Sequence, residues 1–169
     1  AREALALLRA VRARASARSV PLFANDRPDL ALLAGFDGVH LGQGDLAVAD
    51  ARRLGPRLAV GVSTHGLAQL DAALAEHPAY VALGPIFPTA SKRDPDPVVG
   101  PERLVEAARR CRAARVPLLA IGGVSLENAP RVAPWAELGA VISALLPAAG
   151  LAGVTAAAAA LHSALLGSR

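Results

Sequence analysis

The chain has 169 residues, of which 53% are hydrophobic and 3% aromatic, and its formal net charge is +4. This length fits one domain, the hydrophobic content excludes disorder as a description of the whole chain, and no apolar stretch reaches the roughly 18 uncharged residues of a membrane span. The scarcity of aromatic residues argues against a base-stacking nucleic-acid binder, so we expect the positive charge to attract a phosphorylated small molecule.

Six short apolar runs recur along the chain, and each stops at a small or polar residue. Apolar runs of this length without strict alternation are typical of strands buried on both faces of a parallel sheet. We predict strands that start near positions 20, 38, 59, 80, 117 and 138. Helices are predicted over 2–17, 27–34, 45–54, 66–76, 101–112, 125–132 and 155–166.

The predicted strands recur at intervals of about 20 residues, which leaves room for one strand, one short helix and two tight turns. Polar residues at the carboxyl ends of parallel strands are how an α/β barrel builds its active site. Six strands are too few to close a barrel of eight. We therefore predict an α/β fold of the TIM-type (βα)8 barrel class over 1–169, N-terminally truncated to about six βα units, with a small open sheet as the alternative.

Carboxylates follow the first two predicted strands, at Asp26 and Asp45. Two carboxylates, together with substrate phosphates and water, are the usual ligands of octahedral Mg²⁺. Aspartate is equally suited to cap the helix that follows it, so both explanations stay open at this point. Asn25 offers donors and an acceptor to a polar substrate, or serves as a turn residue.

The third strand ends at Ser63, Thr64 and His65, but the sequence lacks the Gly-x-Ser-x-Gly elbow of a serine nucleophile. We expect Ser63 to donate a hydrogen bond to the substrate, and Thr64 or His65 to start a helix. His40 reads as a core or rim histidine. Two further histidines read as surface residues, and no His/Cys cluster has zinc spacing; these two are His77 and His162.

A longer interval follows the fourth strand, where a loop over 85–97 contains four prolines. Prolines stiffen a loop, and a stiff loop at a strand's carboxyl end is a candidate substrate lid. Lys92, the only lysine of the chain, lies there beside Thr89 and Ser91. Two hydroxyls and one ammonium suit a phosphate or diphosphate, although an exposed surface lysine is the ordinary alternative.

Two glycines, Gly122 and Gly123, follow the fifth strand, and Ile142 and Ser143 begin a helix-like turn after the sixth. Glycines let backbone N–H groups approach an anion, and the loops after the last two strands of a barrel commonly hold a phosphate. A plain tight turn also explains the double glycine, but its pairing with Ser143 favours phosphate binding.

A single cysteine, Cys111, excludes a disulfide within the chain and favours a reducing compartment. Arginines interrupt the N-terminal segment, so we expect no secretory signal there and a cytoplasmic location. The expected partners are small phosphorylated molecules, with neither nucleic acid nor membrane, and a homo-oligomer is compatible with the sequence.

Six segments, in chain order, resemble thiamine phosphate synthase, and the match to that family spans roughly residues 1–150. They read Asn-Asp-Arg (25–27), Val-His-Leu-Gly-Gln-Gly-Asp (39–45), Gly-Val-Ser-Thr-His (61–65), Gly-Pro-Ile-Phe-Pro-Thr-Ala-Ser-Lys (84–92), Ile-Gly-Gly (121–123) and Val-Ile-Ser (141–143). The resemblance implies a (βα)8 barrel that joins a hydroxymethylpyrimidine diphosphate to a thiazole phosphate, which gives thiamine phosphate and diphosphate.

The same resemblance implies roles for the strand-end residues. Asp26 and Asp45 would hold Mg²⁺ against the diphosphate. Asn25 and Ser63 would contact the pyrimidine substrate and Lys92 its leaving group, with Lys92 and Ser63 as the catalytic pair. The residues implied to bind the thiazole phosphate are Thr89, Ala90, Ser91, Gly123, Ile142 and Ser143.

The sequence departs from the family pattern in three places. Ser91 stands where the family usually has threonine, and the segment between Gly123 and Ser143 is about one residue short. The family's first two strands, which contribute to the pyrimidine site, have no counterpart before the first predicted strand. Two alternatives stay open: a thiazole tautomerase on the same barrel, whose members tend to lack the paired aspartates and the Thr-x-Ser/Thr-Lys loop, and a non-catalytic remnant that binds thiazole phosphate.

Overall fold

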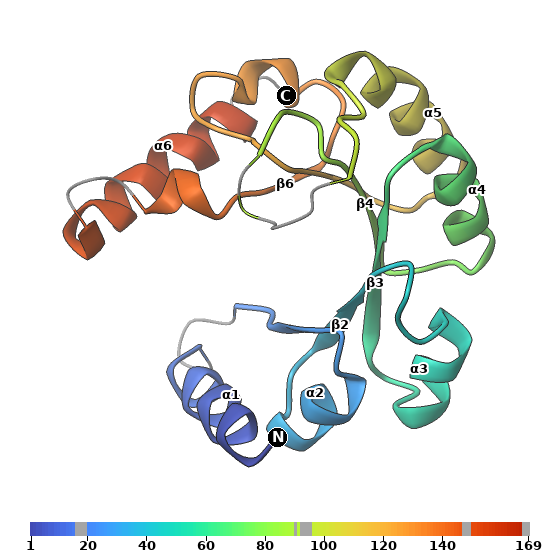
Figure 1. Cartoon of the computed structure of the whole chain (residues 1–169), viewed down its shortest axis with the longest axis vertical. Helices are drawn as coiled ribbons and strands as arrows, with labels where there is room; N and C mark the ends of the chain where they lie inside the picture. The colour runs from blue at the N-terminus through green and yellow to red at the C-terminus, as the bar shows by residue number, and fades with distance from the viewer. Residues whose placement is uncertain (16–19, 90, 92–95, 147–149, 167–169) are drawn as a thin grey trace. The chain divides into compact units, whose positions relative to one another are not determined.

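The computed structural model describes residues 1–15, 20–89, 91, 96–146 and 150–166 (Figure 1). Within these ranges the six apolar runs form strands, as predicted, and the strands follow the order β1-β2-β3-β4-β5-β6 in a sheet. The pairs β1–β2, β2–β3, β4–β5 and β5–β6 are parallel. The strands are β1 (Phe23–Asn25), β2 (Gly38–Leu41), β3 (Ala59–Thr64), β4 (Tyr80–Leu83), β5 (Leu118–Ile121) and β6 (Leu138–Ala140).

Helices alternate with the strands, which confirms the α/β class. They are α1 (Arg2–Ala15), α2 (Pro28–Ala34), α3 (Val48–Leu54), α4 (Leu67–Ala75), α5 (Leu104–Ala114) and α6 (Val154–Leu166). Short 3₁₀ turns add η2 (Pro101–Arg103), η3 (Ala129–Arg131), η4 (Ser143–Leu145) and η5 (Gly150–Gly153). None of the helices in the described ranges has both the length and the apolar character that crossing a bilayer requires.

The chain divides into two compact units, Ala1–Ser63 and Thr64–Arg169. In the first unit, α2 packs against both β1 and β2, and α1 packs on α2 (Figure 1). Pro28 occupies the first turn of α2, where its missing N–H costs no helical hydrogen bond. Gly35, with φ of 69°, ends the helix in the left-handed conformation that glycine adopts freely. The core of this unit includes Leu41 and Val60, which are almost fully buried.

In the second unit, α4 packs against β4, and α5 packs against β4, β5 and α4. Val81, Ala82 and Leu83 of β4 are all fully buried, which confirms that this apolar run is covered on both faces of the sheet. The helix α6 contacts the 3₁₀ turns η3, η4 and η5. The assignment of the whole chain to a single domain stays a prediction.

Several predicted boundaries are wrong. The helix expected over 45–54 begins only at Val48, since the side chain of Asp45 is used in the turn after β2. The helix expected over 125–132 is reduced to η3, because Pro130 has no N–H to donate to a helical hydrogen bond.

Three further differences concern element ends. The first strand starts at Phe23 rather than near position 20, and the helix expected from 101 begins as the 3₁₀ turn η2 and continues to Ala114. Neither Thr64 nor His65 starts a helix, because β3 continues through Thr64 and α4 begins at Leu67. The expected end of the first helix, at position 17, lies outside the described residues.

Candidate active site

The first unit places Asn25 and Asp26 at the carboxyl end of β1. Asn25 is in register with His40 of β2, and the N–H of Asp26 donates to the carbonyl oxygen of His40 at 2.8 Å. Asp26 has a φ of 62°, a left-handed conformation that L-residues adopt rarely. The other described non-glycine residues with positive φ lie at helix ends: His77 is the second residue after α4, and Arg115 directly follows α5. Asp26 instead holds this conformation at a strand end, and such outliers cluster at functional sites.

The helix-cap explanation is wrong for both aspartates. The residue that caps α2 is Arg27, and the one that caps α3 is Ala47. The Oδ2 atom of Asp45 accepts a hydrogen bond from the N–H of Gly42 at 2.7 Å, which closes the turn that leads out of β2. Neither aspartate therefore occupies the N-cap position of the helix that follows it.

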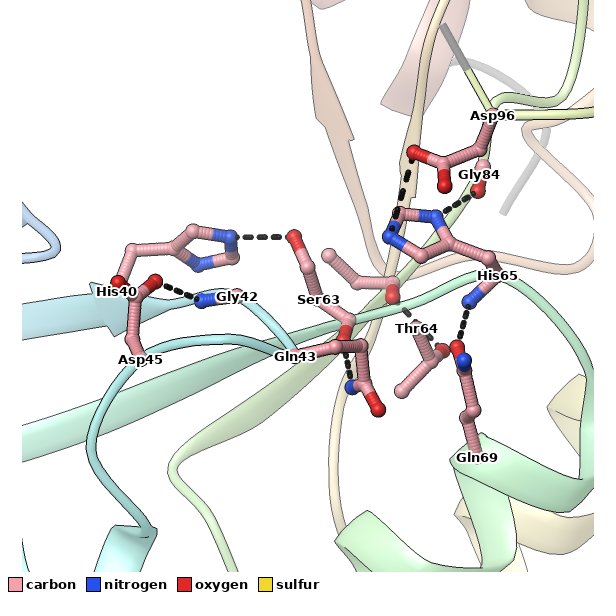
Figure 2. Close-up of polar contacts among 11 residues, drawn as sticks. His40, Gly42, Gln43, Asp45, Ser63, Thr64, His65, Gln69, Gly84 and Asp96 are labelled. Carbon is pink, nitrogen blue, oxygen red and sulfur yellow. Dashed lines mark hydrogen bonds and ion pairs between the residues drawn. The ribbon is translucent and has the colours of Figure 1, made fainter.

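Ser63, at the end of β3 within the first unit, is held by two residues from the end of β2 (Figure 2). Its Oγ lies 2.7 Å from Nε2 of His40, and its carbonyl oxygen accepts a hydrogen bond of 2.6 Å from Nε2 of Gln43. Burial lowers the pKa of His40 below its ordinary 6.5, and the nearby carboxylate of Asp45 opposes part of that shift. His40 is thus a rim histidine, as predicted, whose partner is the predicted substrate-binding serine.

The donor set of this unit fits Mg²⁺. The described residues contain no group of three or more His, Cys, Asp and Glu side chains arranged to hold a metal. Two carboxylates, Asp26 and Asp45, supply hard oxygen ligands, and Mg²⁺ is commonly bound by one or two carboxylates with phosphate and water oxygens in the other positions. The assignment of the metal to these two residues stays a prediction.

The second unit begins with a short polar network around His65 (Figure 2). Nδ1 of His65 lies 2.7 Å from the carbonyl oxygen of Gly84, and Nε2 lies 3.5 Å from Oδ2 of Asp96. The backbone N–H of His65 donates to the side chain of Gln69 in the first turn of α4 at 2.7 Å. Next to it, the fully buried Thr64 donates its hydroxyl to the carbonyl oxygen of Ala82 at 2.9 Å. The imidazole therefore joins the end of β4 to the residue Asp96 of the long loop.

Gly122 and Gly123 form a left-handed loop after β5, with φ of 91° and 65°. A Cβ at Gly122 would lie 2.5 Å from Cα of Pro85, and one at Gly123 would lie 2.5 Å from the carbonyl oxygen of Pro88. Both glycines are therefore required by backbone conformation and by close packing on the segment after β4. A tight turn alone does not account for them.

The other predicted thiazole-phosphate residues fall on loops of the second unit. Ser143 begins η4 after β6, as predicted, and Ile142 before it is 66% exposed. Oγ1 of Thr89 accepts a hydrogen bond from the N–H of Ser91 at 3.3 Å. The predicted residues Ala90 and Lys92 lie outside the described residues.

Four polar residues of these networks have no role predicted from the sequence: Gln43, Gln69, Asp96 and Asn128. Asn128 accepts from the N–H of Ser125, three positions before it, and Gln69 accepts from the N–H of His65, four positions before it. This spacing is typical of capping side chains and could have indicated both residues from the sequence. Gln43 and Asp96 bind residues 20 or more positions away, and no local pattern points to them.

Comparisons with known proteins identify the family of this chain. Residues 1–159 match the model of the family described as thiamine monophosphate synthase. The thiamine-phosphate synthase of Koribacter versatilis (strain Ellin345) is 48% identical over 148 residues, which cover 86% of this chain and 68% of that protein. The one from Anaeromyxobacter dehalogenans (strain 2CP-C) is 50% identical over 143 residues, which cover 83% of this chain and 63% of that protein.

A solved structure, a thiamine phosphate pyrophosphorylase from Pyrococcus furiosus, superimposes with a TM-score of 0.83 at 28% identity, over 98% of this chain and 79% of that chain. The chain thus spans about two thirds of the length of the two curated relatives above. Because the family model covers nearly the whole chain and these sequences agree with it, the chain belongs to the thiamine monophosphate synthase family.

Proposed function

We propose that this chain contributes the transferase activity that joins a hydroxymethylpyrimidine diphosphate to a thiazole phosphate and releases diphosphate. The observation that carries the proposal is that both predicted metal-binding aspartates interact with His40, near the ends of β1 and β2. The N–H of left-handed Asp26 binds the carbonyl oxygen of His40. Burial lowers the pKa of the His40 imidazole, and the carboxylate of Asp45 opposes part of that lowering. Two aspartates that follow neighbouring strands and lie at no helix N-cap position, in a chain of this family, favour a diphosphate substrate with Mg²⁺.

The chemistry needs charge stabilisation more than a protein base. When diphosphate departs from the benzylic-type carbon, positive charge develops on the pyrimidine and negative charge on the leaving oxygens. A bound Mg²⁺ supplies neutralisation of that negative charge. Asp26 and Asp45 would hold the ion, and Lys92 would contact the same leaving group. The thiazole nitrogen is already a nucleophile and requires only positioning.

Each unit has its own binding task in this proposal. In the first unit, Asn25 and Ser63 contact the pyrimidine, and Ser63 is suited to this because His40 and Gln43 fix its hydroxyl and its carbonyl. In the second unit, the loops after β5 and β6 bind the phosphate of the thiazole substrate. Gly123, Ile142 and Ser143 are assigned to that task, and Thr89, Ala90 and Ser91, which follow β4, line the thiazole phosphate site.

We also propose that the six strands are units of a TIM-type eight-stranded barrel. The sequential strand order and the likeness to the Pyrococcus furiosus structure support this. Small phosphorylated substrates are the partners that follow from it, and a cytoplasmic location stays a prediction.

Formation of thiamine phosphate from the two precursors by the full-length gene product tests the proposed function. Asp26→Gly keeps the left-handed backbone accessible and removes only the carboxylate, so we expect turnover to fall by about 100-fold or more while the melting temperature changes little. Asp50→Asn, an exposed aspartate in α3, is the matched control and retains activity. Unchanged turnover in Asp26→Gly would remove the metal assignment. Isomerisation of a thiazole substrate by the same preparation, without any pyrimidine-dependent product, would support the tautomerase instead.

A further inference from the structure

The loop after β5 has three consecutive carbonyl groups that are each bound by a donor from the protein. The carbonyl oxygen of Ile121 accepts from the N–H of Ile86 at 2.9 Å, and that of Gly122 accepts from the N–H of Phe87 at 3.0 Å. The third, that of Gly123, accepts from Nδ2 of the Asn128 side chain at 2.9 Å. The acceptors of this loop are therefore all directed into the protein.

Because the peptide bond is planar, the directions of these carbonyl groups also determine the directions of the N–H groups that follow them. In a trans peptide unit the C=O and the following N–H point in opposite directions. The N–H groups of Gly122, Gly123 and Val124 consequently point away from the groups that hold the carbonyls before them. An anion that approaches these N–H groups meets no carbonyl oxygen from the same three peptide units.

The carbonyl of the Gly123–Val124 peptide is bound by a side chain, whereas the carbonyls of Ile121 and Gly122 are bound by backbone N–H groups. The residue before this peptide, Gly123, is left-handed and has no Cβ, so Gly123 itself offers little steric resistance to rotation of the Gly123–Val124 peptide. Such a rotation would turn the carbonyl oxygen of Gly123 toward the position that the Val124 N–H now faces. The hydrogen bond from Asn128 is the contact that holds this peptide in the observed direction.

Asn128 itself has one defined orientation. Its Oδ1 accepts the N–H of Ser125 at 2.9 Å while its Nδ2 donates to Gly123. Because a backbone N–H only donates and a carbonyl only accepts, exchange of the amide oxygen and nitrogen would break both bonds. The N–H of Ala129 also binds the carbonyl oxygen of Ser125 at 2.9 Å, which closes the turn beneath the side chain.

We infer that Asn128 is a positioning residue for the phosphate of the thiazole substrate, and that the N–H of Val124 binds that phosphate alongside Gly123. The inference rests on the proposed function for the identity of the ligand, but the anion-binding geometry is independent of the reaction. Asn128 does not touch the phosphate; it acts through the peptide unit that it orients.

The experiment uses the full-length gene product, with Asn128→Ala as the test and Glu127→Ala, an exposed neighbour, as the matched control. Inorganic phosphate is titrated into each protein, and the backbone amide signals of Gly123 and Val124 are followed by NMR. We expect both amides of the parent and of the control to shift, and phosphate affinity to fall about fivefold to tenfold in Asn128→Ala. In kinetics, the KM for thiazole phosphate should rise by the same factor, while kcat and the KM for the pyrimidine diphosphate stay unchanged.

The outcomes separate this inference from the proposed function. Equal phosphate affinity in folded Asn128→Ala and in the parent overturns the positioning role. If the parent forms thiamine phosphate but phosphate leaves the Val124 amide unshifted, the inference is wrong and the proposed function stands. If no thiamine phosphate forms but the Asn128-dependent shift of Val124 is present, the anion site stands and the transferase proposal fails.

A structural effect of Asn128→Ala is controlled by Asn128→Asp. The aspartate keeps the acceptor for Ser125 but places a second oxygen against the carbonyl of Gly123, so phosphate affinity should fall at least as far. Equal phosphate affinity in folded Asn128→Asp and in the parent would also overturn the inference.

Discussion

Removal of the Thr64 hydroxyl should destabilise the protein by a predictable amount. Thr64 is fully buried at the end of β3, and its hydroxyl donates to the carbonyl oxygen of Ala82, in a residue that is also fully buried. Thr64→Val keeps the shape of the side chain and leaves that carbonyl without this donor, which costs about 1–3 kcal/mol of unfolding free energy. Thr64→Ser keeps the donor and removes one methyl group, which costs about 1 kcal/mol.

Urea unfolding of the parent and both variants distinguishes the two costs. With a slope of about 2 kcal/mol per molar urea, the midpoint should fall by about 0.5–1.5 M in Thr64→Val and by about 0.5 M in Thr64→Ser. Thr155→Val, at an exposed position of α6, is the control and should change stability by less than about 0.5 kcal/mol. A Thr64→Val protein as stable as the parent would refute the argument that this hydrogen bond is required in the core.

Four further predictions concern the strand ends and the core. Gly84→Ala would place a Cβ 2.2 Å from the backbone carbonyl oxygen of Ile121, so we expect thermal unfolding to show a loss of about 3 kcal/mol or more of unfolding free energy. Gly44→Ala is the control and should be tolerated, because its Cβ would meet nothing within 4 Å. Near-parental stability of Gly84→Ala would contradict the close packing of β4 on β5. Because burial lowers the pKa of His40, the unfolded chain binds more protons than the native protein once the pH falls through 6.5. The contribution of His40 to stability should therefore be full above that pH and decline below it. Denaturation measured as a function of pH should show a flatter decline for His40→Gln. NMR titration should also show a still lower His40 pKa in Asp45→Asn, and a rise there would show that the carboxylate does not act on the imidazole. Burial raises the pKa of the Cys111 thiol to about 11, so a thiol reagent at pH 8 should label the native protein slowly and the urea-unfolded protein quickly, and equal rates would show that Cys111 is accessible.

The sequence by itself determined the α/β class and the positions at which polar residues leave the strands. Burial on both faces produces a continuous apolar run, which is a local signal, and β4 with its fully buried Val81, Ala82 and Leu83 is a clear example. The residue after such a run lies at the carboxyl end of a strand whatever the rest of the chain does. For this reason the sequence alone identifies Asp26, Ser63 and Gly123 as candidates.

Only the tertiary structure decided what those residues contact. Sequence spacing left Asp45 open as a helix cap, and the hydrogen bond from Gly42 shows that it closes a turn instead. His65 binds the carbonyl of Gly84, 19 residues away, through a contact that exists because the ends of β3 and β4 come together. The helix expected over 125–132 is reduced to a 3₁₀ turn that contains Pro130, and only the structure shows that Asn128 binds the backbone of Ser125 and of Gly123. Local propensity fixes where the chain can turn, but the competition for each backbone donor and acceptor is settled by partners that the fold brings near.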